Sequence, residues 1–239
     1  MELSELKEGV ITTIRDTDWY PYFRYFLGSE ELEKPLQTVL EHHSLGFRIT
    51  PQMKYLFRCF YETPKESVKI VFHTEQVAND VNGYDGLCYS RSAKKMLDHH
   101  TSHFLRINRL KGIYRLKGDL TPWAKQGVLL STAAMTNIIR EQNSHFQQWV
   151  PFWNRVFEVF KTELPADIIY VLIGKEVWFR KKQLCPESLV ICLPDLNSVH
   201  KKDKLSLLPY LNEELVKRGK KEIIWHAAEP KDLSTQTTN

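Results

Sequence analysis

Four short segments of the chain are made almost entirely of apolar residues. They span residues 68–72 (VKIVF), 127–131 (GVLLS), 168–173 (IIYVLI) and 188–193 (SLVICL). Apolar runs of this length, without polar alternation, are typical of parallel strands that are buried on both faces of a sheet. We therefore predict four parallel strands.

Apolar residues recur with helical spacing before and between these segments. Residues 51–60 (PQMKYLFRCF) carry one such stripe, and residues 148–164 (QWVPFWNRVFEVFKTEL) carry another. The first stripe consists of Met53, Leu56, Phe57 and Phe60, and the second of Trp149, Phe152, Trp153, Val156, Phe157 and Phe160. Such stripes predict amphipathic helices. We interpret the aromatic stripe as core rather than as a platform for stacking bases.

The alternation of buried strands and helices predicts an α/β fold, a three-layer α/β/α sandwich around a small central parallel sheet. No linker-like stretch divides the chain, so we predict one domain over residues 1–229 and a polar, disordered tail at 230–239. Ligands of such sheets bind at the carboxyl ends of the strands. We therefore expect a site among the residues that follow the four strands.

Composition adds weak limits on partners and location. The chain is 42% hydrophobic and 26% charged with a net charge of +4, which is compatible with a polyanionic partner but does not require one. Its four cysteines show no CxxC spacing and are interpreted as reduced thiols. The sequence has neither a long apolar stretch nor a secretory leader. We expect a cytoplasmic or nuclear protein, neither secreted nor membrane-bound, of cellular or viral origin.

Five stretches between about residues 49 and 225 carry a specific pattern. They are ITPQMKYLFRCFYETPKESVKIV (49–71), GLCYS (86–90), WAKQGVLL (123–130), SH (144–145) with Trp149 and Phe152 behind it, and KRGKKEIIW (217–225). In this order and at near-family spacing, they resemble the uracil-DNA glycosylase family. The resemblance implies that family's fold. Active members flip a uracil out of the duplex and cleave its glycosidic bond.

The resemblance also implies where the family's water-activating loop, GQDPYH, would lie. Its counterpart here is residues 74–79 (TEQVAN). The family's Asp, which orients water and stabilises a cationic sugar, falls on Gln76, and the Tyr that excludes thymine falls on Ala78. A neutral amide supplies neither the negative charge nor the base that this step needs.

The other strand ends differ from the family as well. Thr132 stands where an Asn reads the uracil edge, and one hydroxyl cannot reproduce a bidentate amide contact. Leu193 takes the place of the His that stabilises the departing uracil, and Asn197 that of the Leu that wedges into the base stack. Lys175 replaces the Ser of a Gly-Ser turn. Only Tyr89, where a Phe stacks on the base, keeps its physical role.

These changes predict a catalytically inactive homologue, a pseudo-enzyme that acts as a binding or scaffold protein, chiefly through protein–protein interaction. One alternative is a DNA-binding adaptor or replication accessory factor. Its DNA contacts would involve Lys175, Asn197, Lys201, Lys202 and Lys204. A second alternative is a DNA glycosylase with altered chemistry. Distant branches of the superfamily carry Glu-Gln in this loop, and Glu75 would then be the carboxylate.

A metal site is a further reading of the DHHTSH segment. There His99 and His103 have helical spacing beside Asp98. Two imidazoles on one helix face do not complete a site, and the sequence offers no evident third ligand nearby. The adjacent pair His42 and His43 is a weaker candidate. We therefore expect neither a metal nor a cofactor.

Overall fold

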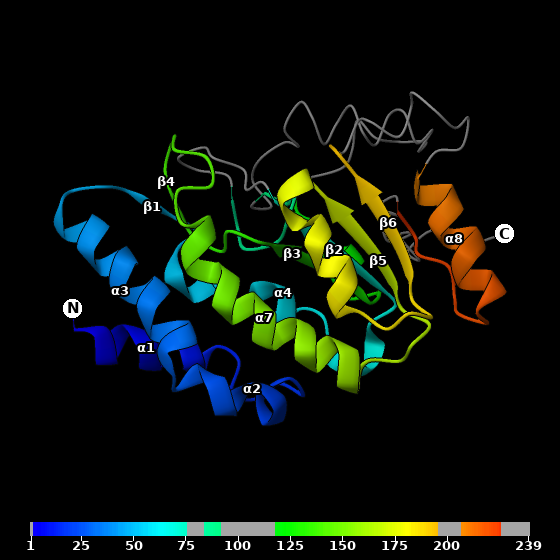
Figure 1. Ribbon diagram of the computed structural model, residues 1–239, viewed down its shortest axis with the longest axis horizontal. Coiled ribbons are helices and arrows are strands. Elements are labelled where there is room, and N and C mark those ends of the chain that lie inside the picture. Colours follow the sequence, from blue (N-terminus) through cyan, green and yellow to red (C-terminus); the bar gives the residue numbers. More distant parts are fainter. Residues whose placement is uncertain (1, 76–83, 92–117, 196–206, 226–239) are drawn as a thin grey trace, which may run out of the picture.

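The computed structural model of the protein describes residues 2–75, 84–91, 118–195 and 207–225 (Figure 1). At its centre is a parallel sheet of four strands with the spatial order β3-β2-β5-β6. The strands are β2 (Ile70–Thr74), β3 (Val128–Thr132), β5 (Ile169–Ile173) and β6 (Leu189–Leu193). All four predicted strands are confirmed, and each ends at or within two residues of its predicted end. β6 is half-buried, however, and not buried on both faces as predicted.

Helices flank this sheet. The longest, α7 (Phe146–Glu163), is contacted by α3 (Glu30–Ser44), while α1 (Leu3–Thr12) and α2 (Tyr20–Leu27) contact α3 (Figure 1). Helix α8 (Leu207–Lys217) lies at the end of the molecule nearest β6 and farthest from α1. A central parallel sheet with flanking helices confirms the predicted α/β sandwich.

Shorter elements complete the described part of the chain. β1 (Ile49–Thr50) pairs in antiparallel orientation with β4 (Asn137–Ile138), outside the main sheet. The remaining elements are single turns or short helices. They are η1 (Met53–Tyr55), α4 (Arg58–Tyr61), η2 (Lys65–Ser67), α6 (Thr121–Ala124) and η4 (Lys175–Gln183).

The continuous helix predicted over residues 51–60 is wrong. The segment contains η1 and α4, and Phe57 between them has φ −101° and ψ 21°. The ring of Phe57 stacks on that of Phe152, with 5.6 Å between the ring centroids. So short a segment is marginal as a helix on its own, so packing decides its conformation. Three of the four residues of the predicted stripe, Leu56, Phe57 and Phe60, are buried, while Met53 is half-buried.

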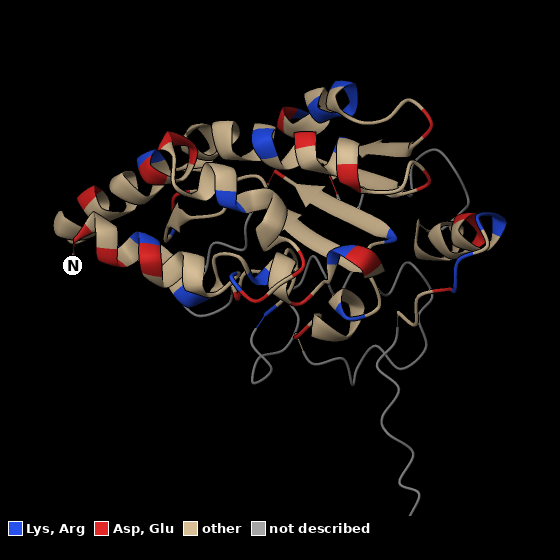
Figure 2. Ribbon diagram, turned by 90° about the horizontal axis from the view of Figure 1, so that it is seen from below, with Lys and Arg blue, Asp and Glu red and all other residues tan. Residues whose placement is uncertain are grey.

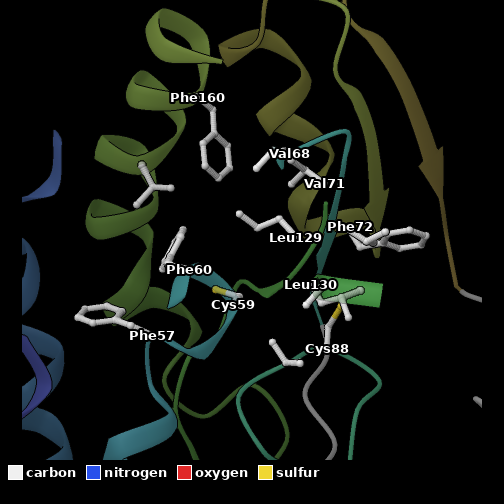
Figure 3. Packing of buried hydrophobic residues seen from close by; sticks show 14 of the residues in the cluster. Phe57, Cys59, Phe60, Val68, Val71, Phe72, Cys88, Leu129, Leu130 and Phe160 are labelled. Carbon is white, nitrogen blue, oxygen red and sulfur yellow. The ribbon is translucent and has the colours of Figure 1, made fainter. Parts of the chain in front are cut away.

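The aromatic stripe of α7 forms the centre of the core. Every residue of that stripe is at most 1% exposed, which confirms its interpretation as core. In Figure 3, Phe160 of α7 lies on the same side as Phe57 and Phe60 and points toward the residues of β2 and β3, including Val71 and Leu129. The sheet and the two helical segments therefore share one hydrophobic cluster.

The described surface mixes charges of both signs. Figure 2 shows Lys and Arg interspersed with Asp and Glu along the helices, while the strands are nearly free of charge. At the end of α8, Lys217 and the following Arg218 both pair with Glu214. No helix in the described ranges is long and apolar enough to cross a membrane. The predicted tail lies outside the described residues, and the single domain stays a prediction.

Replacing Phe157 with Ala tests the contribution of the α7 stripe. The ring is fully buried, and its centroid lies 5.1 Å from that of the His73 ring on β2. Because the truncation leaves a cavity, we expect the free energy of unfolding to fall by about 3 to 5 kcal/mol in urea denaturation. Val216→Ala on α8, where the side chain is 57% exposed, should change it by less than about 0.5 kcal/mol. Equal losses of unfolding free energy in Phe157→Ala and Val216→Ala would contradict a special contribution of the α7 stripe to stability.

Candidate functional site

The four parallel strands end at one edge of the sheet, which we call the carboxyl edge. Thr74 at the end of β2 pairs with Thr132 of β3 on one side and with Ile173 of β5 on the other. Ile173 in turn pairs with Leu193 of β6. The residues that follow these four positions are therefore brought together, as the sequence predicted for a ligand site.

Glu75 follows β2 directly and is held at this edge by three hydrogen bonds. Its backbone N–H donates to the carbonyl of Ile173 over 2.8 Å. Its carboxylate accepts one bond from Asn143 Nδ2 over 3.3 Å and another from the backbone N–H of Glu176 over 3.3 Å. Glu176 lies in the first turn of η4. The carboxylate is thus oriented from two sides by N–H donors, which interact more strongly with an ionised carboxylate than with a neutral one.

Gly174 makes room for this carboxylate. Its φ is +101°, a backbone conformation that favours glycine. A Cβ at this position would lie 2.3 Å from Glu75 Oε2 and 2.4 Å from Glu75 Cβ. The absence of a side chain after β5 therefore allows Glu75 to lie against the end of that strand.

Backbone strain is concentrated near the same edge. Among the described residues, three that are not glycine have positive φ: Tyr89 (61°), Arg140 (76°) and Asn143 (57°). The Tyr89 hydroxyl lies 3.1 Å from Thr74 Oγ1, and Asn143 bonds to Glu75. Two of the three strained residues thus contact the last residue of β2 or the residue that follows it. Strained backbone of this kind is often found at functional sites.

Thr132 contacts a second hydroxyl, that of Tyr84. The Tyr84 hydroxyl lies 2.8 Å from Thr132 Oγ1, and the Thr132 hydroxyl donates to the carbonyl of Ala134 over 3.3 Å. Tyr84 is therefore the donor in the first of these bonds. Burial raises the pKa of Tyr84 well above its usual value, so the phenol stays protonated at neutral pH.

Arg58 fixes the turn that carries Tyr84 and Tyr89. Its guanidinium pairs with Asp85 over 2.9 Å and donates to the Asp85 carbonyl over 3.1 Å. The Asp85 carboxylate also accepts bonds from Ser90 Oγ (2.9 Å) and from the backbone N–H of Leu87 (3.3 Å). Burial raises the pKa of Asp85, and the Arg58 charge opposes that shift. Tyr84 is therefore anchored one residue before a buried ion pair.

The structure brings together only part of the predicted residue set. Glu75, Tyr89, Thr132 and Leu193 all lie at the carboxyl edge, and Lys175 is exposed at the start of η4. Several predicted residues lie outside the described parts of the chain. These are Gln76, Ala78, Asn197, Lys201, Lys202 and Lys204, together with the metal candidates Asp98, His99 and His103.

Two residues with direct contacts at this edge were not predicted, namely Asn143 and Tyr84. Asn143 lies in a polar turn, REQNSH, where the only available signal is the tolerance of Asn for positive φ. Within the described ranges, no group of three or more His, Cys, Asp or Glu residues could hold a metal ion.

A chain of buried hydrogen bonds supports the turn that carries Asn143. Trp149 Nε1 donates to Thr136 Oγ1 (2.8 Å), and Thr136 Oγ1 lies 2.9 Å from His145 Nδ1. His145 Nε2 lies 2.8 Å from His42 Nδ1. Because an indole N–H can only donate, the order that uses each proton once has Thr136 donating to His145 and His145 donating to His42. That order requires a neutral His145. Burial, followed by the neighbouring His42, lowers the pKa of His145 to about 4.

Comparison with known proteins gives a consistent set of relatives. No protein-family model matches the chain. The chain is 28% identical over 178 residues to the uracil-DNA glycosylase of Acinetobacter baylyi, a match that covers 73% of this chain and 75% of the relative. It is 29% identical over 182 residues to the uracil-DNA glycosylase of Anoxybacillus flavithermus, covering 73% and 78%.

Solved structures agree on the fold. The crystal structure of mimivirus uracil-DNA glycosylase aligns with a TM-score of 0.75 and 17% identity, over 87% of this chain and 85% of that one. A variant of the mimivirus protein, solved in complex with UGI, aligns with the same TM-score at 18% identity, over 87% of each chain. The resemblance found in the sequence is confirmed. The prediction of a pseudo-enzyme is wrong, because the relatives and structural neighbours are glycosylases.

The neutral state of His145 predicts a pH dependence of stability. Its pKa in the folded protein, about 4, lies below the unfolded value of 6.5, so only the unfolded chain binds this proton between those values. The resulting stabilisation is fully present above pH 6.5. It is lost as the pH falls toward 4, by about 2 to 3 kcal/mol of unfolding free energy.

Urea denaturation at several pH values measures this effect. The stability difference between wild type and His145→Gln should narrow as the pH falls from 6.5 to 4. His43→Gln, at the exposed neighbour of His42, should follow the wild-type curve. A constant difference between wild type and His145→Gln would show that the His145 proton is not linked to folding.

Proposed function

We propose that this chain, which is similar to uracil-DNA glycosylases over 73% of its length, is a DNA glycosylase in which Glu75 is the catalytic carboxylate. The observation that carries the proposal is the fixation of Glu75 at the carboxyl edge by Asn143 Nδ2 and the N–H of Glu176. The position of the family's catalytic Asp falls on Gln76, which is neutral. Glu75 is thus the acidic side chain nearest to that position in the sequence.

The proposed reaction cleaves the bond between a base and its deoxyribose. The base leaves with the electron pair of that bond, and positive charge develops on the sugar. A fixed carboxylate stabilises this charge without having to reorganise. It then takes a proton from the attacking water as the water oxygen bonds to C1′, and the base anion takes up the proton. The products are a free base and an abasic site.

The Glu75 carboxylate has hydrogen-bond acceptor sites left over for the catalytic role. A carboxylate offers about four acceptor sites, and the two N–H donors occupy two of them. The others remain for a water proton and for the sugar cation. DNA is the partner that this function requires, and a flipped-out base is the form in which such enzymes reach their target.

The edge of the base would meet hydroxyl groups rather than an amide. Thr132, the counterpart of the family's base-reading Asn, is bonded to Tyr84. Uracil is the base that the named relatives indicate, and we propose it as the first substrate to test. Leu193 provides no donor or charge for the departing base, so we expect slow excision that is best observed in single turnover.

The test is a single-turnover assay with excess protein on uracil-containing single-stranded and double-stranded DNA. We expect abasic product from the wild type and a rate at least about 100-fold lower for Glu75→Gln, which removes the charge and keeps the shape. Glu141→Gln is a matched control. It changes an exposed carboxylate in the turn that carries Asn143, and it should leave the rate unchanged.

Two outcomes would overturn the proposal. If the wild type releases no base from either substrate under these conditions, excision of uracil is excluded. If product forms equally well in wild type and in Glu75→Gln, another group supplies the charge. Folding of each variant is checked by its urea transition, so a loss of activity by unfolding is recognised.

A further inference from the structure

We infer that Asn143 is a positioning residue for the Glu75 carboxylate, an inference that rests on the function proposed for Glu75. Asn143 was not suggested by the sequence. Its amide is the one described side-chain donor to Glu75, at 3.3 Å, while the other donor to the carboxylate is the backbone of Glu176. Only the Asn143 donor can therefore be altered by substitution of its own residue.

Two local features of Asn143 are unfavourable by themselves. Its φ of +57° lies in the left-handed region, which costs a non-glycine residue free energy, although Asn tolerates it better than most residues. Its Oδ1 atom is buried and finds no hydrogen-bond partner among the described residues. An unsatisfied buried acceptor is also costly. Neither feature is needed for a surface turn, where glycine would remove both.

The orientation of the Asn143 amide is determined by Glu75. If the amide were rotated by half a turn, Oδ1 would face the carboxylate and two acceptors would be placed together. With Nδ2 toward Glu75, the contact between the two side chains is attractive. The bond to Glu75 thus accounts for the direction in which this side chain is fixed, despite the unpaired oxygen that it leaves behind.

The turn around Asn143 is rigidly attached to the fold. The carbonyl of Asn143 accepts the N–H of Phe146, at the start of α7, over 3.0 Å. Next to it, Ser144 Oγ accepts the N–H of Ile138 in β4 over 2.8 Å. The buried His145 follows directly. Asn143 therefore presents its amide to Glu75 from a support joined to both α7 and β4, as a positioning residue requires.

Two substitutions at residue 143 separate positioning from folding. Asn143→Gly keeps the left-handed backbone at no steric cost and removes the donor. Asn143→Asp keeps the size of the side chain and replaces the donor with a second negative charge beside Glu75. Gln142→Ala, at the exposed neighbouring position, is the matched control.

Single-turnover pH–rate profiles are the first readout. For Asn143→Gly we expect a maximal rate lower by about 10-fold with substrate affinity within about 2-fold of wild type, since orientation and not binding is lost. For Asn143→Asp we expect the acidic limb of the profile to move to higher pH by about one unit, since a like charge disfavours ionisation of the neighbouring carboxyl. Gln142→Ala should reproduce the wild-type profile.

The second readout needs no activity. In the free protein, the side-chain carboxyl carbon of Glu75 is followed by NMR through a pH titration, with its assignment taken from Glu75→Gln. We expect the titration of Glu75 to move to higher pH in Asn143→Asp and not in Gln142→Ala. If the two side chains were not in contact in solution, Asn143→Asp would leave the position of this titration unchanged.

The two readouts distinguish failure of the inference from failure of the proposed function. If Glu75→Gln abolishes excision while both Asn143 variants keep wild-type profiles and titrations, the positioning role is wrong and the catalytic role of Glu75 stands. If wild type excises no base but Asn143→Asp moves the Glu75 titration, the proposed glycosylase function fails, and the contact between Asn143 and Glu75 is still supported. If the Asn143 variants only lose stability and the titration of Glu75 in Asn143→Asp stays that of wild type, the inference is overturned.

Discussion

The register of β2 between its two neighbours determines where every described residue of the carboxyl edge lies. Its pairing places Thr74 opposite both Thr132 and Ile173, so Glu75 emerges between β3 and β5. Side chains alternate between the two faces of a strand, so a shift of one residue would turn Thr74 and its neighbours to the opposite faces. The buried apolar side chains of the strand, Ile70, Val71 and Phe72, hold this register through their packing. The geometry of the site is therefore a consequence of the core.

The same packing explains which parts of the fold the sequence could predict. The strands β2, β3 and β5 are continuous apolar runs because they are fully buried, and α7 has a strong helical period because one face of it is buried. Residues 51–60 carry a helical pattern as well, but contacts such as Phe57 on Phe152 break them into η1 and α4. The helices α1 to α3 lie before the stretch that resembles the family, and no prediction was made for them. The packing of α2 and α3 on α7, and of α1 on α3, was not accessible from local pattern alone.

The site was predictable at the strand ends and not beyond them. Glu75 and Thr132 follow or end apolar runs, so their position could be read directly from the sequence. The contact of Asn143 with Glu75 joins residues 68 positions apart, and that of Tyr84 with Thr132 joins residues 48 apart. Such contacts depend on how turns are placed by the whole fold. The prediction of lost catalysis failed for a related reason, since it judged each position of the family motif separately.

The buried guanidinium of Arg180 stabilises η4, the element that carries the backbone donor Glu176 to Glu75. Arg180 of η4 is 1% exposed, and within the described ranges it has no carboxylate partner. It donates instead to Asn154 Oδ1 and to the carbonyl of Val150, both on α7, and its guanidinium lies 5.0 Å from the Phe157 ring centroid. Burial lowers the pKa of Arg180 to about 10, so it stays charged at neutral pH. Arg180 thus fixes η4, whose first turn provides the N–H of Glu176, to α7, the helix whose start supports Asn143.

Gly174 lies between β5 and η4 and limits which residues can stand at positions 75 and 174. As long as position 75 carries a glutamate in this orientation, position 174 cannot acquire a side chain. Among relatives of this chain, position 174 should therefore stay glycine wherever position 75 carries a side chain as long as glutamate or glutamine in this orientation.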